Sequence, residues 1–179
     1  MGRSAILTPE RCASALELIA PTVASHLTPG GRFAARFGEL VVLDPVRSYS
    51  AAYDEGPESA AFQDDVIMWH HRFGDPAEWD FDYGHAARTK AYLAFKHRLP
   101  SEWVLDQYGY LLEPDLCLYG GTAVDPRGGL IVGFSGAAAH HDRFVCEIML
   151  AALRNVVGEE LERIRATPDL DYVPRPGPA

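Results

Sequence analysis

Four of the seven histidines in this 179-residue chain stand in two adjacent pairs, and imidazole is the side chain best suited to move protons near neutral pH. Adjacent residues of a strand point to opposite faces, so at most one of His70 and His71 can enter a given pocket. His140 and His141 directly precede Asp142, whose carboxylate could orient an imidazole ring. We therefore take these five residues as candidates for proton transfer. The alternative for each histidine is a surface or half-buried position without a ligand.

A second group of side chains has the chemistry needed to bind a flat acid. Arginine can hold a carboxylate with two parallel hydrogen bonds, and an aromatic ring can stack on a planar ligand. The candidate ligand-binding residues of this kind are Trp69, Arg72, His85, Arg88 and Lys90. The more ordinary alternatives are a core position for the aromatic ring and a helix-surface salt bridge for the lysine.

Carboxylates and further aromatic rings are concentrated between residues 55 and 103. The carboxylates are Asp64, Asp65, Glu78, Asp80 and Asp82, and the rings are Trp69, Trp79, Phe81, Tyr83 and Trp103. One carboxylate could act as a general base whose pKa is raised by its neighbours, and the rings could stack on a ligand. A solvated loop and a packed core are the alternatives. The sequence has no HExxH, no CxxC and no histidine spacing typical of zinc, so we predict no dedicated metal site.

Composition excludes several kinds of partner. The formal charge is −9 and the isoelectric point is near 5.2, which argues against a nucleic-acid partner because such a protein needs a basic face. No stretch is apolar enough for a signal peptide or a membrane span, so no membrane partner is expected. The three cysteines, Cys12, Cys117 and Cys146, are odd in number and have apolar neighbours. They predict buried, reduced thiols and a cytoplasmic location.

Apolar periodicity and turn signals divide the chain into helices and strands. The expected helices are residues 8–27, which Pro21 could kink or shorten, 85–99 and 142–165. The expected strands are residues 39–44, 66–73 and 130–135, with 48–53 as a possible second arm of a hairpin. Most strands follow one another, which favours an α+β, two-layer domain with an antiparallel sheet and helices packed on one face.

Several short motifs, in order, give the chain a resemblance to a known family. They are Ala87-Arg88-Thr89-Lys90-Ala91, the run from Tyr119 to Val124, the run from Gly129 to Gly136, and Asp142 at the start of a helix. With residues 40–44 as a first strand ending in Asp, these motifs resemble the HbpS/GlcG-like (haem-degrading domain) family over residues 8–160. The resemblance implies a profilin/PAS-like sheet with a pocket. It adds Gly121 and Thr122 to the candidate ligand-binding residues.

The chain departs from the family pattern in two places. Ala123 stands where family members usually have Pro, and the segment from about 55 to 82 is longer than the family's usual turn. A connection of this length is uncommon in a compact domain, so we expect the inserted segment to be ordered and to shape a pocket or an interface. We predict a single domain over residues 1–165 and a proline-rich tail over 166–179.

Three functions are compatible with these residues. The resemblance implies a small-ligand-binding protein whose ligand is haem or a related flat anion. The alternative is a cofactor-independent lyase or isomerase of aromatic compound catabolism, which would act on a small aromatic acid such as a hydroxylaminobenzoate by histidine and carboxylate acid–base catalysis. The third is a scaffold subunit, with Ile148, Leu153 and Val157 as an exposed apolar face. The resemblance also implies a homo-oligomer.

Overall fold

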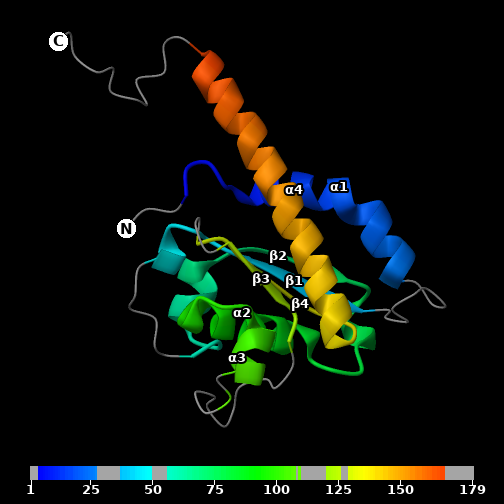
Figure 1. Ribbon diagram of the computed structural model, residues 1–179. Helices are drawn as coiled ribbons and strands as arrows, with labels where there is room; N and C mark the ends of the chain where they lie inside the picture. Colours follow the sequence, from blue (N-terminus) through cyan, green and yellow to red (C-terminus); the bar gives the residue numbers. More distant parts are fainter. Residues whose placement is uncertain are drawn as a thin grey trace.

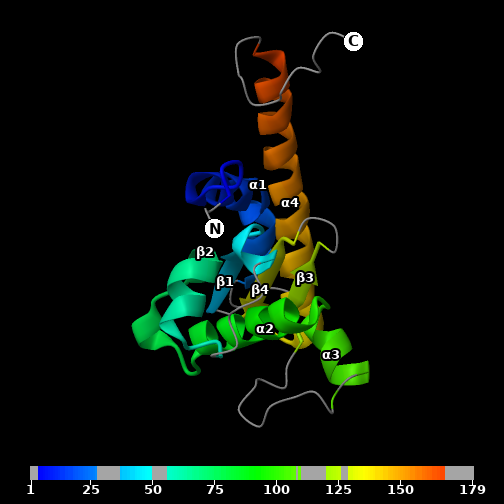
Figure 2. The ribbon, with the colours of Figure 1, turned by 90° about the vertical axis from the view of Figure 1, so that its left-hand side faces the viewer.

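A four-stranded antiparallel sheet lies between two layers of helices (Figures 1 and 2). The structure, a computed structural model, describes residues 4–27, 37–49, 56–107, 109, 120–125 and 129–167, without the side chains of residues 26, 27 and 49. The helices α1 (Pro9–Leu27) and α4 (Ala139–Ala166) cover one face of the sheet. The helices α2 (Tyr83–His97) and α3 (Ser101–Gln107) lie on the other side.

The sheet order is β2-β1-β4-β3, and each neighbouring pair is antiparallel. The strands are β1 (Gly38–Leu43), β2 (Ile67–Phe73), β3 (Thr122–Val124) and β4 (Ile131–Ser135). All six residues of the inner strand β1 are buried. A strand that is buried on both sides reads as a continuous apolar run, which is why residues 40–43 show no polar alternation.

The apolar core has one part on each face of the sheet. Leu40 and Val42 of β1 point toward α1 and α4, whereas Val41 and Leu43 point toward α2. This alternation follows from the strand period of two. Both faces of β1 therefore need a helical cover.

The predicted α+β class, with an antiparallel sheet and helices packed against it, is confirmed, but the helices lie on both faces instead of one. The reason is the composition of α2, where small residues recur at 86, 87, 91 and 94. A Cβ built on Gly133 of β4 would lie 2.9 Å from the carbonyl oxygen of Ala87 and 3.0 Å from Cβ of Ala91. Small side chains on both elements thus let α2 pack closely under the sheet, which adds a third layer.

Most predicted elements are present with shifted ends, and one expectation is wrong. The helix expected over 8–27 continues through Pro21, and the strands expected over 39–44, 66–73 and 130–135 are β1, β2 and β4. The second arm of the hairpin, expected over residues 48–53, does not start at residue 48, because residues 47–49 form a 3-10 turn; residues 50–53 lie outside the described residues. The strand that pairs with β1 on this side is β2, so residues 67–73 of the proposed insertion belong to the sheet.

The pairing of β1 with β2 contains a β-bulge. Pairing is regular from Gly38 opposite Phe73 to Val42 opposite Trp69, and Leu43 then lies opposite Ile67. Met68 is therefore the additional residue of β2. A bulge of this kind changes which face the residues beyond it occupy.

The apolar residues proposed as an exposed face of α4 are not exposed. Leu153 is fully buried, and Ile148 and Val157 pack against the core between α4, α1 and the sheet. The scaffold hypothesis therefore loses the surface on which it was based. The homo-oligomer itself stays a prediction.

Cys12 and Cys146 are buried free thiols, as expected. Cys117 and the predicted tail from residue 168 onward lie outside the described residues. In the described part of the chain, no helix has both the length and the apolar character needed to cross a bilayer.

Candidate active site

Three strands place a row of polar residues at one end of the sheet, on the face covered by α2. Glu39 of β1 lies opposite Arg72 of β2 on one side and opposite Ser135 of β4 on the other. The register of the sheet alone brings these three residues together. The row is the starting point of the candidate site.

Glu39 is a buried carboxylate surrounded by cations, although it carries a charge and is only 1% exposed. Its Oε2 accepts a hydrogen bond from Nε of Arg72 at 2.9 Å. Its Oε1 lies 3.3 Å from Nδ1 of His70 and 3.7 Å from a terminal nitrogen of Arg88. We call Glu39, His70, Arg72 and Arg88 the Glu39 cluster. A buried charge is tolerated only with partners of this kind.

The cluster keeps Glu39 ionised. Burial by itself would raise the pKa of Glu39, but the hydrogen bonds and charges of His70 and Arg72 outweigh burial and hold the pKa below its usual value. The imidazole of His70 is about half exposed, since its side chain retains 50% of its accessible surface. The cluster is thus buried at its carboxylate and open to solvent at its histidine.

A cavity of about 610 Å³ opens over the cluster. Its inner end is lined by Glu39, Arg72 and Arg88, and its outer wall by Pro76 and the run from Trp79 to Asp82. Phe81 is 51% exposed at this wall. The volume lies within the range usual for small-molecule sites.

The start of α2 borders the cavity. Asp82 caps the helix by accepting a hydrogen bond from the backbone nitrogen of His85 at 2.8 Å. Gly84, in the first turn, lies so close to the site that an added Cβ would be 2.9 Å from Oε2 of Glu39. Glycine at position 84 therefore allows the helix to approach the carboxylate.

A second carboxylate holds the outer side of Arg88. Glu58 accepts from Nδ1 of His85 at 2.8 Å and from two nitrogens of Arg88 at 3.3 Å. Arg88 thus lies between buried Glu39 and exposed Glu58. His85 contacts Glu58 and Thr89, and it does not line the cavity.

The aromatic wall is held together by Tyr83. Its ring is nearly perpendicular to the rings of Trp79 and Phe81, at centroid distances of 5.6 and 5.5 Å. Its hydroxyl donates to Oδ1 of Asp80 at 2.8 Å. Burial and then this contact raise the pKa of Tyr83 to about 12, so the hydroxyl remains a hydrogen-bond donor.

The polar row continues from Ser135 into a sealed ion pair. Nζ of Lys90 lies 2.7 Å from Oδ2 of Asp142 and also donates to Oγ of Ser135 and to the carbonyl of Phe134, both at 3.2 Å. Lys90 and Asp142 are 2% and 1% exposed. Burial raises the pKa of Asp142 to about 6, although Lys90 opposes the rise. Neither residue reaches a cavity lined by described residues.

Gly121 and Thr122 support this pair and do not line the cavity over Glu39. Gly121 has a φ of +132°, and an added Cβ would lie 2.6 Å from Cβ of Asp142. Its carbonyl accepts from the thiol of Cys146 at 3.2 Å. Oγ1 of Thr122 accepts from the backbone nitrogen of Ser101 at 2.7 Å. Both residues have internal partners, so the structure gives no sign that they contact a ligand.

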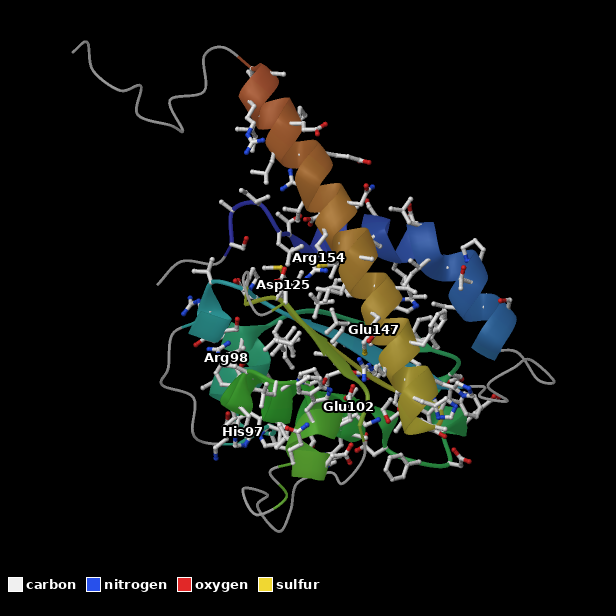
Figure 3. The ribbon with its side chains drawn as sticks, viewed as in Figure 1. His97, Arg98, Glu102, Asp125, Glu147 and Arg154 are labelled. Atoms are coloured by element: carbon white, nitrogen blue, oxygen red, sulfur yellow. The ribbon has the colours of Figure 1, made fainter. Side chains whose placement is uncertain are left out.

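The second histidine pair lies at another cavity. His140 lines a space of about 390 Å³ at the start of α4, and its ring is 3.9 Å from the ring of His141. Arg143, beside them, pairs with Glu102 of α3 at 3.2 Å and with Glu147 of α4 at 2.7 Å. Figure 3 labels both glutamates. The two predicted histidine pairs therefore do not share one site.

Trp69 and His71 lie on the opposite face of the sheet from Glu39. Their rings stack at a centroid distance of 5.9 Å, and His71 also contacts the edge of Phe73 at 4.8 Å. Burial lowers the pKa of His71, which keeps the ring neutral. The alternation expected for His70 and His71 is thus observed, and His70 is the member that faces the Glu39 cluster.

Three members of the Glu39 cluster were candidates from the sequence, but Glu39 itself was not. Its signal was present: it is a charged residue directly before the apolar run from Leu40 to Leu43. A charge at the start of a strand that is buried on both faces needs partners. Among the described residues, no group of three or more acidic, histidine or cysteine side chains could hold a metal ion.

This chain has a distant similarity to a protein of known structure. No protein-family model and no curated protein matches the sequence. Among solved structures, the crystal structure of Klebsiella pneumoniae protein ORFY, described under the family DUF336, is similar at 14% identity and a TM-score of 0.49. The match covers 86% of this chain and 96% of that one. DUF336 is the GlcG-like family. A similarity of this size decides neither family nor function.

Proposed function

We propose that this chain is a small-ligand-binding protein of the HbpS/GlcG-like kind and that it binds a flat acid in the cavity over Glu39. One observation carries the proposal: two arginines and an aromatic wall line a cavity of about 610 Å³ whose inner end is a buried carboxylate. Arg72 uses Nε toward Glu39, which leaves its terminal nitrogens for a ligand carboxylate. Phe81, half exposed at the wall, offers a ring face for stacking.

Haem fits this lining less well than a small aromatic acid. None of the described lining residues is a histidine, cysteine, methionine or tyrosine, the usual ligands of haem iron. Glu39, Asp80 and Asp82 would also face the haem propionates. The cavity therefore favours a ligand that needs no iron ligand from the lining and carries fewer negative charges than haem.

Calorimetric titration with 4-hydroxybenzoate tests the proposal. Arg88→Met should weaken binding about tenfold or more, because a charge-assisted hydrogen bond to the carboxylate is lost. Arg163→Met is the matched control, since Arg163 is an exposed arginine that pairs with Glu160 far along α4. Equal affinities of the two variants would contradict the proposal. If the wild-type protein forms a haemin complex whose Soret band is lost in His70→Ala, the ligand is haem and the aromatic acid is excluded.

A second candidate function, acid–base catalysis on the same ligand, rests on the contact between Glu39 and His70. Glu39 lines the cavity, and Nδ1 of His70, which does not line it, lies 3.3 Å from Oε1 of Glu39. A carboxylate that accepts from Nδ1 orients the ring and fixes its tautomer, so that Nε2 can take a proton from a substrate. The residue roles would then be Glu39 as the orienting group, His70 as the base, and Arg72 and Arg88 as carboxylate binders.

Release of ammonia from a panel of aromatic hydroxylamines, such as 4-hydroxylaminobenzoate, tests for this lyase activity. If the wild-type protein is active, His70→Gln should lower kcat by about 100-fold or more, because glutamine cannot take the proton. His140→Gln is the control, since His140 lines the other cavity. Lack of turnover by the pure wild-type protein would remove the catalytic reading and leave the binding proposal standing.

A further inference from the structure

The charges that line the cavity over Glu39 are separated along its length. Arg72 and Arg88 lie at the inner end, beside the buried Glu39 carboxylate. Asp80 and Asp82 lie in the exposed outer wall. The lining therefore has three carboxylates and two guanidinium groups, so a ligand with only negative charge would satisfy the inner end and be repelled by the outer one.

The two outer carboxylates keep an acceptor for a ligand. Oδ1 of Asp80 accepts from the hydroxyl of Tyr83, and Oδ1 of Asp82 accepts from the backbone nitrogen of His85, both at 2.8 Å. Within the described residues, the second oxygen of each carboxylate has no hydrogen-bond partner. These oxygens can accept hydrogen bonds from an ammonium group, which has only donors.

The rings in the same wall also suit a cation. Trp79 and Phe81 line the cavity and both pack nearly at right angles to Tyr83, at 81° and 72°. Ring faces attract cations through their quadrupole, most strongly for Trp. Aromatic faces interleaved with carboxylates are the chemistry by which proteins bind ammonium groups.

We infer that the ligand of this cavity is a zwitterion, with a carboxylate bound by Arg72 and Arg88 and a basic nitrogen bound beside Asp80, Trp79 and Phe81. The inference rests on the proposed function, since it takes the cavity as the ligand site. It narrows the class of flat acids to acids that also carry an amine or substituted ammonium group on the opposite end of the molecule. Asp80 and Phe81 are then the residues that determine specificity.

The test compares two probes of equal size in calorimetric titrations. The first, 4-(aminomethyl)benzoate, is a zwitterion, and the second, 4-ethylbenzoate, has the same number of heavy atoms without the positive charge. The zwitterion should bind about tenfold tighter, the scale of a desolvated cation–π contact. Asp80→Asn, which retains an acceptor for Tyr83, should remove most of this preference, because the binding of 4-(aminomethyl)benzoate weakens while the binding of 4-ethylbenzoate does not.

The control variant is Glu162→Gln, which removes one exposed carboxylate of α4 away from the cavity and should retain the tenfold preference. Equal or tighter binding of 4-ethylbenzoate by the wild-type protein would overturn the zwitterion inference while the binding proposal stands. An equal loss of preference in Asp80→Asn and Glu162→Gln would also overturn it, because net charge would then explain the preference. Lack of binding of both probes would overturn the inference and the proposed function together.

Discussion

The Glu39 cluster and the Lys90–Asp142 pair lie at the same end of the sheet and use the same kinds of groups, but of the two, within the described part of the chain, the cluster is the one that lines a cavity. Ser135 joins them, since it lies opposite Glu39 in the sheet and accepts from Lys90. In the sealed pair, Nζ of Lys90 has three partners, and neither residue lines a cavity formed by described residues. The open cluster has a buried carboxylate whose partners His70 and Arg72 are half exposed. Accessibility, and not charge, therefore separates the candidate site from a structural ion pair.

The largest expected effect comes from breaking the sealed pair. Lys90→Met should lower the free energy of unfolding by about 3–5 kcal/mol at pH 7, because the Asp142 carboxylate is left buried without its counter-charge. Arg88→Met, in the open cluster, should cost only about 1–2 kcal/mol, because Glu39 keeps His70 and Arg72. Urea unfolding of both variants measures the difference. Equal losses would break the comparison.

Substitution of a glycine beside the sealed pair should have the next largest effect on the free energy of unfolding. Gly121→Ala should cost about 2–3 kcal/mol, because alanine is strained at a φ of +132° and its Cβ would lie 2.6 Å from Cβ of Asp142. Gly158→Ala is the matched control: nothing lies within 4 Å of its added Cβ, so this helix position should gain up to about 1 kcal/mol. Thermal unfolding of each variant measures whether stability falls or rises. A Gly121→Ala variant as stable as the wild type would show that this end of the sheet is loosely packed.

The two buried carboxylates should respond to pH in opposite directions. The folded pKa of Asp142 is raised from 3.8 to about 6, so the folded state binds the proton more tightly and stability falls as pH rises through this window. The folded pKa of Glu39 is lowered from 4.5, so its contribution is present above pH 4.5 and is lost as pH falls through the folded pKa.

Variants of the two carboxylates test this contrast by urea unfolding between pH 3 and 7. Asp142→Asn should make stability rise more steeply with pH between about 4 and 6, since the opposing titration is removed. Glu39→Gln should flatten the loss of stability below pH 4.5. Changes of slope in the same direction for both variants would refute the assignment.

The smallest expected effect belongs to the exposed carboxylate of the site. Glu58→Gln should change the free energy of unfolding by less than about 0.5 kcal/mol, because Glu58 is half exposed and its ion pairs with His85 and Arg88 are screened by water. The affinity of the Glu58→Gln variant for 4-hydroxybenzoate should not fall, since Glu58 no longer competes with the ligand carboxylate for Arg88. A large loss of stability would show that segment 56–60 is anchored by this contact.

The sequence predicted those parts of the fold in which local pattern and burial agree. The apolar run from Leu40 to Leu43 and the periodicity of residues 142–165 are local signals, and both elements are present. The second helical layer was missed because α2 has apolar residues on most of its surface, so its pattern does not indicate which face packs. The position of Lys90 was also predicted wrongly. It lies within a basic stretch, which indicated a solvent-facing side chain, but it is buried.

The candidate site was predicted in part. Side-chain chemistry was enough to select His70, Arg72 and Arg88, since histidine can transfer protons and arginine can bind a carboxylate. Which residues share the site depends on strand register, and no local signal in the sequence fixes that Glu39 lies opposite Arg72. The separation of His70 from His140 is likewise a consequence of topology, because the two pairs are on different elements at different cavities.

The β-bulge at Met68 lies between the helical turn of residues 61–66 and the part of β2 that carries His70 and Arg72. Pairing from Val42 to Gly38 is regular, and the register of His70 and Arg72 is set within that stretch. The bulge therefore separates two face patterns along one strand, and a change in pairing before Met68 does not move either side chain to the other face. Phe62 and Val66 of the preceding turn can pack into the core with their own geometry, while the spacing of the polar groups at the far end of β2 stays fixed.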